Sequence, residues 1–330
     1  MRQYLPLETL TKTLYGRSVY TDGALSLCWS LSGFGVRFAA EGAVLHFVPD
    51  YRADQPVYVL VTLDGRETKY AIFDGREKIL LENLGEGVHT LEFRRLSEGE
   101  APLKVAALEL VGGELQVLDA PKLPELRLEF LGDSITCGYG NLAEKGCSVF
   151  TTYEEDPTRA YAGLTAAALG ADIRDVSISG QGIVKNCRGE LGTPISVFFH
   201  WDSRRGREEH DFASWVPHAV IVNAGTNDNG GKVTDEEFRT GAADFLRDIR
   251  AQYPDAHIFW AYGLMGLRYD AVLREVIGAL SESDKKLHYV PIRPIWEFEG
   301  ETGANGHPNV KGHTRGAAVL TAAIRAAMGI

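Results

Sequence analysis

The chain has 330 residues, of which 45% are hydrophobic, and it carries a net charge of −11 at pH 7. A chain of this length exceeds what a single hydrophobic core usually fills, so two domains are expected. The acidic balance argues against nucleic acid as a partner, because phosphate binding requires clustered lysine and arginine side chains.

The N-terminal segment, Met1 to Glu8, lacks the apolar core of an export signal. No later stretch reaches the roughly 18 uninterrupted apolar residues of a membrane span, so no membrane partner is expected. A cytoplasmic protein is therefore predicted, the alternative being a leader that has been removed. The sequence is compatible with a homo-oligomer but carries no signal for one.

Between residues 25 and 118, apolar and polar residues alternate with a short period, and turn formers such as Asp64-Gly65 separate the runs. This pattern predicts consecutive antiparallel strands. A β-sandwich of jelly-roll type is the simplest packing that buries one face of every strand. Such a domain could bind carbohydrate itself, or it could pack against the rest of the chain or mediate self-association.

Two prolines in the segment 119–124 withdraw N–H donors and disfavour helix, which indicates a linker. We therefore expect a β-sandwich domain over residues 1–120 and a second domain over residues 121–330. In the second domain, short apolar runs alternate with stretches of helical spacing, which predicts a three-layer α/β domain with a parallel, flavodoxin-like sheet. The expected strands are 126–131, 173–178, 219–223, 258–262 and 287–291, and the clearest helices are 235–252 and 311–327.

The first of these strands ends abruptly in Gly132-Asp133-Ser134. A serine at this point lies where a buried strand turns into a helix, and the backbone N–H groups at a helix start are unpaired and partly positive. An oxyanion that forms beside Ser134 would therefore find donors directed at it. The same tripeptide also describes an ordinary turn in which Asp133 or Ser134 caps the helix.

Three further blocks follow along the chain: Ser179-Gly180-Gln181, Gly225-Thr226-Asn227-Asp228 and Gly306-His307-Pro308-Asn309. Each has an ordinary reading, as a left-handed glycine, an Asx turn or a surface loop. However, Ser134, Gly180 and Asn227 each follow a predicted parallel strand, and the carboxyl ends of parallel strands meet at one edge of the sheet. In this order, the four blocks resemble the SGNH (GDSL-type) hydrolases.

The resemblance implies that Ser134 is the nucleophile and His307 the base. It also implies an oxyanion hole formed by the backbone N–H groups of Ser134 and Gly180 with the side-chain amide of Asn227. Asp133 and Asp228 are expected to cap turns and brace the loops rather than to titrate. The sequence from residue 132 to residue 140, together with the preceding β-rich segment, is similar to carbohydrate esterase family 2, which removes acetyl groups from sugar hydroxyls.

The sequence departs from the broad family at the third member of the triad. An aspartate usually precedes the histidine by two or three residues, but Ala304 and Asn305 occupy these positions here. In serine proteases, replacing the orienting aspartate by asparagine lowers the rate about 10⁴-fold. We therefore expect a Ser134–His307 dyad in which the Asn305 side chain or a backbone carbonyl accepts the imidazole N–H and fixes the tautomer.

Trp201, Trp260 and Trp296 are candidates for contact with a sugar, although tryptophan is often a core residue. The histidines lack metal-type spacing, so neither a metal nor a cofactor is expected. The favoured function is a carboxylic ester hydrolase that releases acetate from acetylated xylan or glucomannan oligosaccharides. The alternatives are an esterase acting on other short acyl or lipid esters, and a catalytically weak carbohydrate-binding protein.

Overall fold

A computed structural model gives the fold of the chain and describes residues 1–48, 55–73, 75–98, 103–144 and 146–330. The chain divides into two compact units. One comprises Met1–Leu123 with Asp202–Glu208, and the other comprises Pro124–Trp201 with Glu209–Ile330. The segment Asp202–Glu208, which the sequence places in the second domain, thus groups with the first unit. Among the described residues, no helix is both long and apolar enough to cross a membrane.

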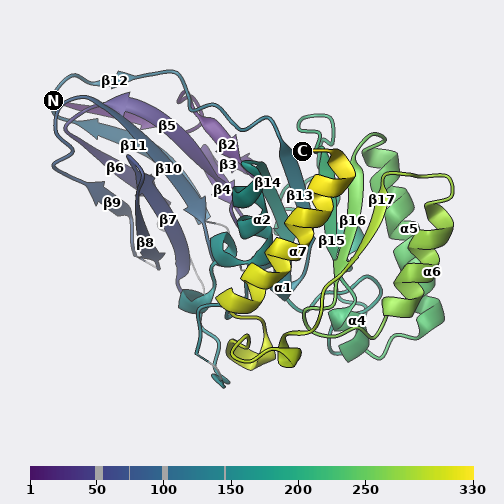
Figure 1. Ribbon diagram of the computed structural model, residues 1–330. Coiled ribbons are helices and arrows are strands. Elements are labelled where there is room, and N and C mark those ends of the chain that lie inside the picture. Colours follow the sequence, from purple (N-terminus) through teal and green to yellow (C-terminus); the bar gives the residue numbers. More distant parts are fainter. Residues whose placement is uncertain (49–54, 74, 99–102, 145) are drawn as a thin grey trace. The chain divides into compact units, whose positions relative to one another are not determined.

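The first unit consists of two antiparallel sheets, drawn in purple to blue in Figure 1. One sheet has the order β3-β4-β11-β6-β9, with β1 paired to β11. Its strands are β1 (Arg2–Pro6), β3 (Val19–Thr21), β4 (Ala24–Leu27), β6 (Gly42–Phe47), β9 (Lys78–Leu81) and β11 (Leu103–Val111). The other sheet has the order β12-β5-β10-β7-β8, with β2 paired to β5. Its strands are β2 (Thr13–Tyr15), β5 (Gly33–Ala39), β7 (Val57–Leu63), β8 (Arg66–Ile72), β10 (Val88–Arg95) and β12 (Gln116–Val117).

The alternating sequence pattern explains this sandwich. Along β7, Val57, Val59 and Val61 are buried while the residues between them are half-buried. Successive strand residues point to opposite faces, so one face of each strand enters the core. Residues from both sheets, among them Phe38 and Leu108, form one hydrophobic cluster.

The second unit contains a five-stranded parallel sheet with the order β14-β13-β15-β16-β17. Its strands are β13 (Arg127–Gly132), β14 (Asp172–Ser177), β15 (Ala219–Asn223), β16 (His257–Tyr262) and β17 (Leu287–Pro291). This is the flavodoxin-like order: β14 is added on one side of β13, and the later strands are added on the other side. The expected parallel sheet is confirmed, and the expected strands differ from the observed ones by at most one residue at each end.

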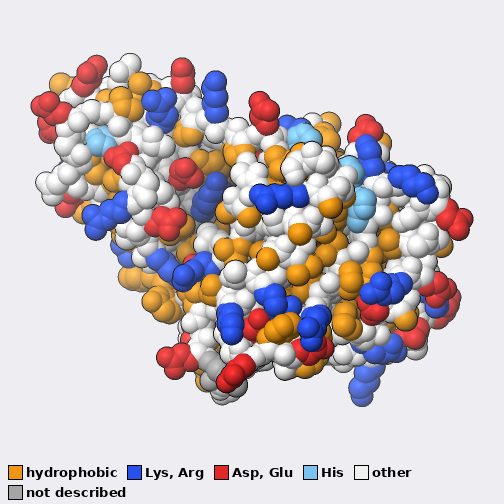
Figure 2. Space-filling model, in the orientation of Figure 1, with side chains coloured by type: hydrophobic (Ala, Val, Ile, Leu, Met, Phe, Trp, Pro, Cys, Tyr) orange, Lys and Arg blue, Asp and Glu red, His pale blue; other side chains and the backbone are white. Residues whose placement is uncertain are grey.

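Helices cover the sheet in two pairs. Helix α2 (Tyr161–Leu169) packs against α7 (Val310–Met328), and α5 (Asp235–Gln252) packs against α6 (Asp270–Leu280). In Figure 1, α7 (yellow) crosses one face of the sheet, and α5 and α6 lie beyond β17. A capping box between Thr234 and Glu237 starts α5, whose buried side includes Phe238 and Ile249. Figure 2 shows acidic and basic side chains interspersed over the visible face of each unit.

Short helices occupy the loops that surround the carboxyl ends of the strands. They are α1 (Ser134–Cys137), α3 (Ile195–Phe198), α4 (Thr226–Gly230), and the 3-10 helices η1 (Thr152–Glu154), η2 (Pro157–Arg159), η3 (Ile295–Glu297) and η4 (Ala304–Gly306). Gly132 pairs in register with Ser177 on one side and with Asn223 on the other. The loops after β13, β14 and β15 therefore leave the sheet at the same level, at its topological switch point.

Candidate active site

Ser134 is the first residue of α1, one residue after the inner strand β13, and it is buried, with 6% of the residue exposed. Asp133 caps this helix: its Oδ1 accepts a hydrogen bond from the Ile135 N–H at 3.0 Å. A Cβ on Gly132 would overlap the hydroxyl of Thr136, so the turn requires glycine at that position. The residues around Ser134 thus fix a tight strand-to-helix turn that presents its hydroxyl at the edge of the sheet.

His307 lies in the loop between η4 and α7, in the part of the chain that follows the last strand, β17. Its Nε2 is 2.9 Å from the Oγ of Ser134, although the two residues are 173 positions apart in the sequence. In the neutral tautomer that carries its proton on Nδ1, Nε2 accepts a hydrogen bond from the serine hydroxyl. This is the geometry in which an imidazole can remove the serine proton.

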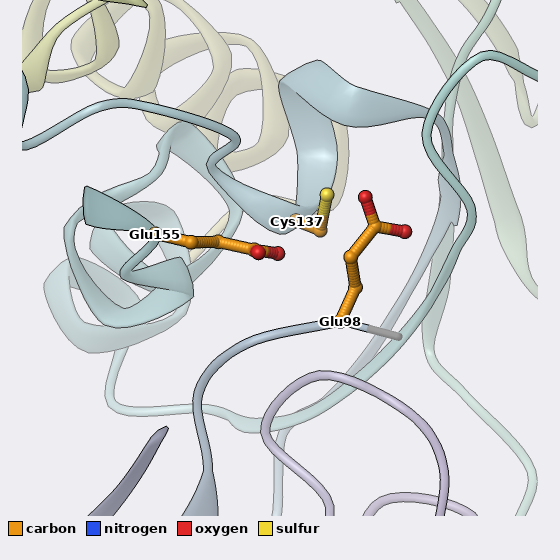
Figure 3. A group of neighbouring side chains, drawn as sticks. All are labelled: Glu98, Cys137 and Glu155. Carbon is orange, nitrogen blue, oxygen red and sulfur yellow. The ribbon is translucent and has the colours of Figure 1, made fainter. Parts of the chain in front are cut away.

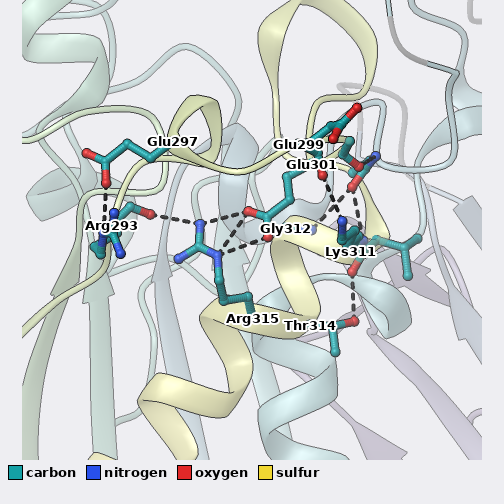
Figure 4. A network of polar contacts seen from close by, with 11 residues as sticks. Arg293, Glu297, Glu299, Glu301, Lys311, Gly312, Thr314 and Arg315 are labelled. Atoms are coloured by element: carbon teal, nitrogen blue, oxygen red, sulfur yellow. Dashed lines mark hydrogen bonds and ion pairs between the residues drawn. The ribbon is translucent and has the colours of Figure 1, made fainter.

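An ion pair between the buried Glu301 and the half-buried Arg315 anchors the loop that carries His307 (Figure 4). The carboxylate of Glu301, a residue with 3% of its surface exposed, accepts from the guanidinium of Arg315 on α7 at 2.8, 3.0 and 3.1 Å. Arg315 also donates to the carbonyl of Arg293 at 2.9 Å. Bidentate contacts of this kind fix orientation as well as distance.

Backbone hydrogen bonds fold the same loop back on itself. The Gly303 N–H donates to the His307 carbonyl at 2.7 Å, and the Asn309 N–H donates to the Glu301 carbonyl at 2.9 Å. Asn309 then caps α7, since its Oδ1 accepts from the N–H groups of Lys311 and Gly312. His307 is therefore held between an anchored residue and a capped helix.

Gly180 and Asn227 lie in the two neighbouring loops. Gly180, after β14, has a φ of 80°, a left-handed conformation that favours glycine. Asn227 lies in α4, after β15, and its Nδ2 donates to Asp133 Oδ2 and to the Gln181 carbonyl, both at 2.9 Å. The amide of Asn227 thus links the turn that carries Ser134 to the loop that carries Gly180.

Asp228 braces the same loop. Its carboxylate accepts from the backbone N–H groups of Ile183, Val184 and Lys185 at 2.9, 2.7 and 3.2 Å. Burial raises the pKa of Asp228, and the three N–H donors oppose that shift. Asp228 thus fixes the path of the chain just after Gly180.

Asn305 differs from expectation. Its side-chain amide donates to the hydroxyl of Tyr139 at 3.1 Å rather than bonding to the imidazole. Its backbone is left-handed, with a φ of 48°, and its N–H donates to the carbonyl of Cys147. The Tyr139 ring in turn lies 4.6 Å from the His307 ring, with 41° between the planes. Asn305 therefore reaches His307 through Tyr139.

Comparison with known proteins agrees with this geometry. Residues 130–315, more than half of the chain, match the GDSL-like Lipase/Acylhydrolase family. The chain belongs to this family. The match begins within β13, just before Ser134, and ends within α7, just after His307.

Two curated relatives of this GDSL-like protein are longer than the chain. Cellulase/esterase CelE of Acetivibrio thermocellus is 33% identical over 262 residues, which are 76% of this chain and 31% of that protein. An acetylxylan esterase / glucomannan deacetylase of Cellvibrio japonicus is 29% identical over 230 residues, which are 68% of this chain and 57% of that protein. The chain thus spans less than two thirds of the length of these relatives.

Solved structures extend the similarity to nearly the whole chain. A family two carbohydrate esterase from Clostridium thermocellum in complex with cellohexaose is 27% identical, with a TM-score of 0.85, over 96% of this chain and 99% of that one. An acetyl xylan esterase (Est2A) from Butyrivibrio proteoclasticus has a TM-score of 0.87 at 21% identity, over 100% and 99% of the two chains, and shows the shared fold. These matches confirm a jelly-roll plus SGNH architecture of carbohydrate esterase family 2 type.

One of the three tryptophans expected to contact a sugar is wrongly assigned. Trp260 of this GDSL-like protein lies on β16, is fully buried and donates to the Ala224 carbonyl at 3.2 Å, so it is a core residue. Helices cover both faces of the parallel sheet, which leaves no exposed side on an inner strand. Trp296 is 63% exposed, in η3, and Trp201 is half-buried in a β-bridge to Glu209. For these two, sugar contact stays a prediction.

The sequence pattern does not identify several residues that lie around the site. Tyr139 lies in the segment from residue 132 to residue 140, but nothing in its spacing signals a contact with His307. Glu301 and Arg315 form a pair 14 positions apart, which is not a helical spacing. Figure 3 shows Cys137, the last residue of α1, and Glu155, which follows η1; both are buried in the segments beside the nucleophile.

Proposed function

We propose that this GDSL-like protein is a serine esterase that removes O-acetyl groups from sugars. The observation that carries the proposal is the 2.9 Å approach of His307 Nε2 to Ser134 Oγ, at the edge of a parallel sheet where such folds bind ligands. Relatives named acetylxylan esterase / glucomannan deacetylase support sugar acetates as the substrate class.

In this reaction His307 removes the proton of Ser134 as its Oγ attacks the acetyl carbonyl. The tetrahedral intermediate collapses, and the sugar oxygen leaves with the proton that His307 returns. The acetyl group is then bound to Ser134 as an ester. Water, deprotonated by His307, attacks this ester, and the bond to Ser134 Oγ breaks as His307 returns the proton to that oxygen and acetate is released.

The negative charge of the intermediate would be stabilised by the N–H groups of Ser134 and Gly180 and by the amide of Asn227. Loss of one such donor typically lowers the rate 10²–10³-fold. The Asn227 amide already donates to Asp133 and to the Gln181 carbonyl. Because a bond to a carboxylate is the stronger of the two, the oxyanion would displace the Gln181 carbonyl.

Hydrolysis of 4-nitrophenyl acetate and longer-chain esters tests the reaction, and acetate release from acetylated xylan and glucomannan oligosaccharides tests the substrate class. Ser134→Ala and His307→Ala should each lose at least about 10³-fold in kcat. Ser148→Ala, an exposed serine in the same unit, serves as the matched control and should match the wild type.

The outcomes separate the alternatives. Equal, negligible turnover by wild type and Ser134→Ala would refute catalysis and leave a carbohydrate-binding protein. Faster hydrolysis of long-chain esters than of acetate would point to lipid or other acyl esters. Acetate release from the oligosaccharides, lost in Ser134→Ala, is the expected result.

A further inference from the structure

The segment Gly138-Tyr139-Gly140 connects the nucleophile to the histidine loop. Gly138 ends α1 in the left-handed conformation, and the Tyr139 N–H donates to the Ser134 carbonyl at 3.0 Å. On the other side, the carbonyl of Gly140 accepts from the N–H of Ala304 at 3.1 Å. Tyr139 therefore lies on a short backbone connection between the turn of Ser134 and the loop of His307.

Contacts with Phe150, His307 and Asn305 fix the side chain of Tyr139. Its ring stacks on Phe150 at 3.8 Å, with 13° between the planes, and lies 4.6 Å from the His307 ring. Its hydroxyl accepts a hydrogen bond from Asn305 at 3.1 Å. Because Asn305 is itself bonded to the Cys147 carbonyl, the ring has little freedom to leave the imidazole.

The position of the ring has an electrostatic consequence. When His307 takes the proton of Ser134 it becomes an imidazolium, and a cation within about 6 Å of an aromatic centroid is attracted by the ring's quadrupole. The attraction is stronger where water is excluded, and here Tyr139 and His307 are both half-buried beside the buried Ser134. An aromatic ring can thus supply some of the stabilisation that a carboxylate gives in a triad.

We propose that Tyr139 is a positioning residue of the Ser134–His307 pair, holding the imidazole towards the serine hydroxyl and stabilising the imidazolium that forms during the reaction. The mechanistic part rests on the proposed esterase function. Phe150 fixes the plane of the Tyr139 ring by stacking on it, and Asn305 fixes the position of the Tyr139 hydroxyl by donating a hydrogen bond to it.

Kinetics on 4-nitrophenyl acetate, normalised to folded protein, give the first test. Tyr139→Leu should lower kcat roughly 10-fold with KM changed less than about 2-fold, because the ring acts on the reacting base rather than on the substrate. Tyr139→Phe keeps the ring and should retain most of the wild-type kcat. Tyr153→Leu, an exposed tyrosine in η1, is the matched control. A Tyr139→Leu variant with wild-type kcat would overturn the proposal.

The pKa of the His307 ring, followed by NMR titration, gives a second test that needs no turnover. If the ring stabilises the imidazolium, Tyr139→Leu should lower this pKa by about half a unit, and Tyr139→Phe should not. The other groups near the imidazole, Ser134 on α1 and His313 on α7, are the same in every variant. Equal pKa values in wild type and Tyr139→Leu would refute the role. If the pKa shifts as expected but the wild-type protein hydrolyses no ester, the contact between Tyr139 and His307 stands and the proposed esterase function is refuted.

Discussion

The side-chain amide of Asn227 donates a hydrogen bond to the carboxylate of Asp133 at 2.9 Å, while the other oxygen of the same carboxylate caps α1 at Ile135. One buried acidic side chain therefore holds both the turn that presents Ser134 and the amide expected to bind the oxyanion. We therefore expect Asp133 to act on the site by positioning these groups.

Replacing Asp133 by Asn should lower kcat about 10–100-fold, less than the 10²–10³-fold expected for Asn227→Ala. An asparagine can still cap α1 through its oxygen, but it no longer offers a carboxylate to the Asn227 amide. Steady-state kinetics on 4-nitrophenyl acetate measure both variants. The double variant should be no slower than Asn227→Ala alone, because both changes act on the same amide. Fully additive losses would contradict this coupling.

Glu301→Gln should reduce the free energy of unfolding by roughly 2 kcal/mol, since a charged hydrogen bond to Arg315 is lost at a buried position. It should also lower kcat, because the loop that carries His307 loses its anchor. Urea denaturation and ester hydrolysis measure the two effects. Arg293→Ala is the control: its ion pair with Glu297 is exposed and is worth about 0–1 kcal/mol. Equal effects of the two substitutions would show that burial of the Glu301 pair is unimportant.

Gly140→Ala should be more damaging than Gly146→Ala. Both glycines have a positive φ, of 61° and 85°, so both substitutions carry the backbone strain of about 1–2 kcal/mol. At Gly140 an added Cβ would also lie 2.5 Å from the Cβ of Ala304, whereas at Gly146 nothing lies within 4 Å. Thermal unfolding and kcat should therefore separate the two variants. Indistinguishable behaviour would mean that the His307 loop can move away without loss.

Stability should fall on acidification partly because of His313. This residue on α7 is fully buried, accepts from the Tyr161 N–H through Nδ1, and burial lowers its pKa to about 3. A histidine whose pKa is lower in the folded than in the unfolded state binds fewer protons when folded. Above pH 6.5 His313 is neutral in both states and does not reduce the free energy of unfolding. As the pH falls from 6.5 towards 3, the unfolded chain takes up the proton first, and the free energy of unfolding decreases.

The variant His313→Asn isolates this contribution, because an asparagine can accept the same N–H but does not titrate. Between pH 7 and pH 4 the wild type should lose about 3 kcal/mol more stability than the variant, as judged by urea denaturation at each pH. Parallel stability curves for the two proteins would rule out His313 as a source of acid sensitivity.

The sequence predicts those site residues whose position depends on where a strand ends. Ser134, Gly180 and Asn227 directly follow buried apolar runs, and parallel pairing brings such positions together. The sequence predicts much less where the decisive quantity is the direction of a side chain. The amide of Asn305 points to Tyr139 because its backbone is left-handed, and no periodic pattern encodes that angle. Trp260 lies in a predicted inner strand of a three-layer domain, in which helices cover both faces of the sheet, so its burial follows from the predicted fold itself.

The hydrogen bond between Ser134 and His307 joins the first strand of the parallel sheet to the loop after its last strand. Nearly the whole second unit must therefore be synthesised and folded before the two side chains can meet. A chain that stops before α7 lacks the helix to which the histidine loop is anchored. Ester hydrolysis would then require the second unit to be completely folded, and incompletely synthesised chains would hydrolyse no ester.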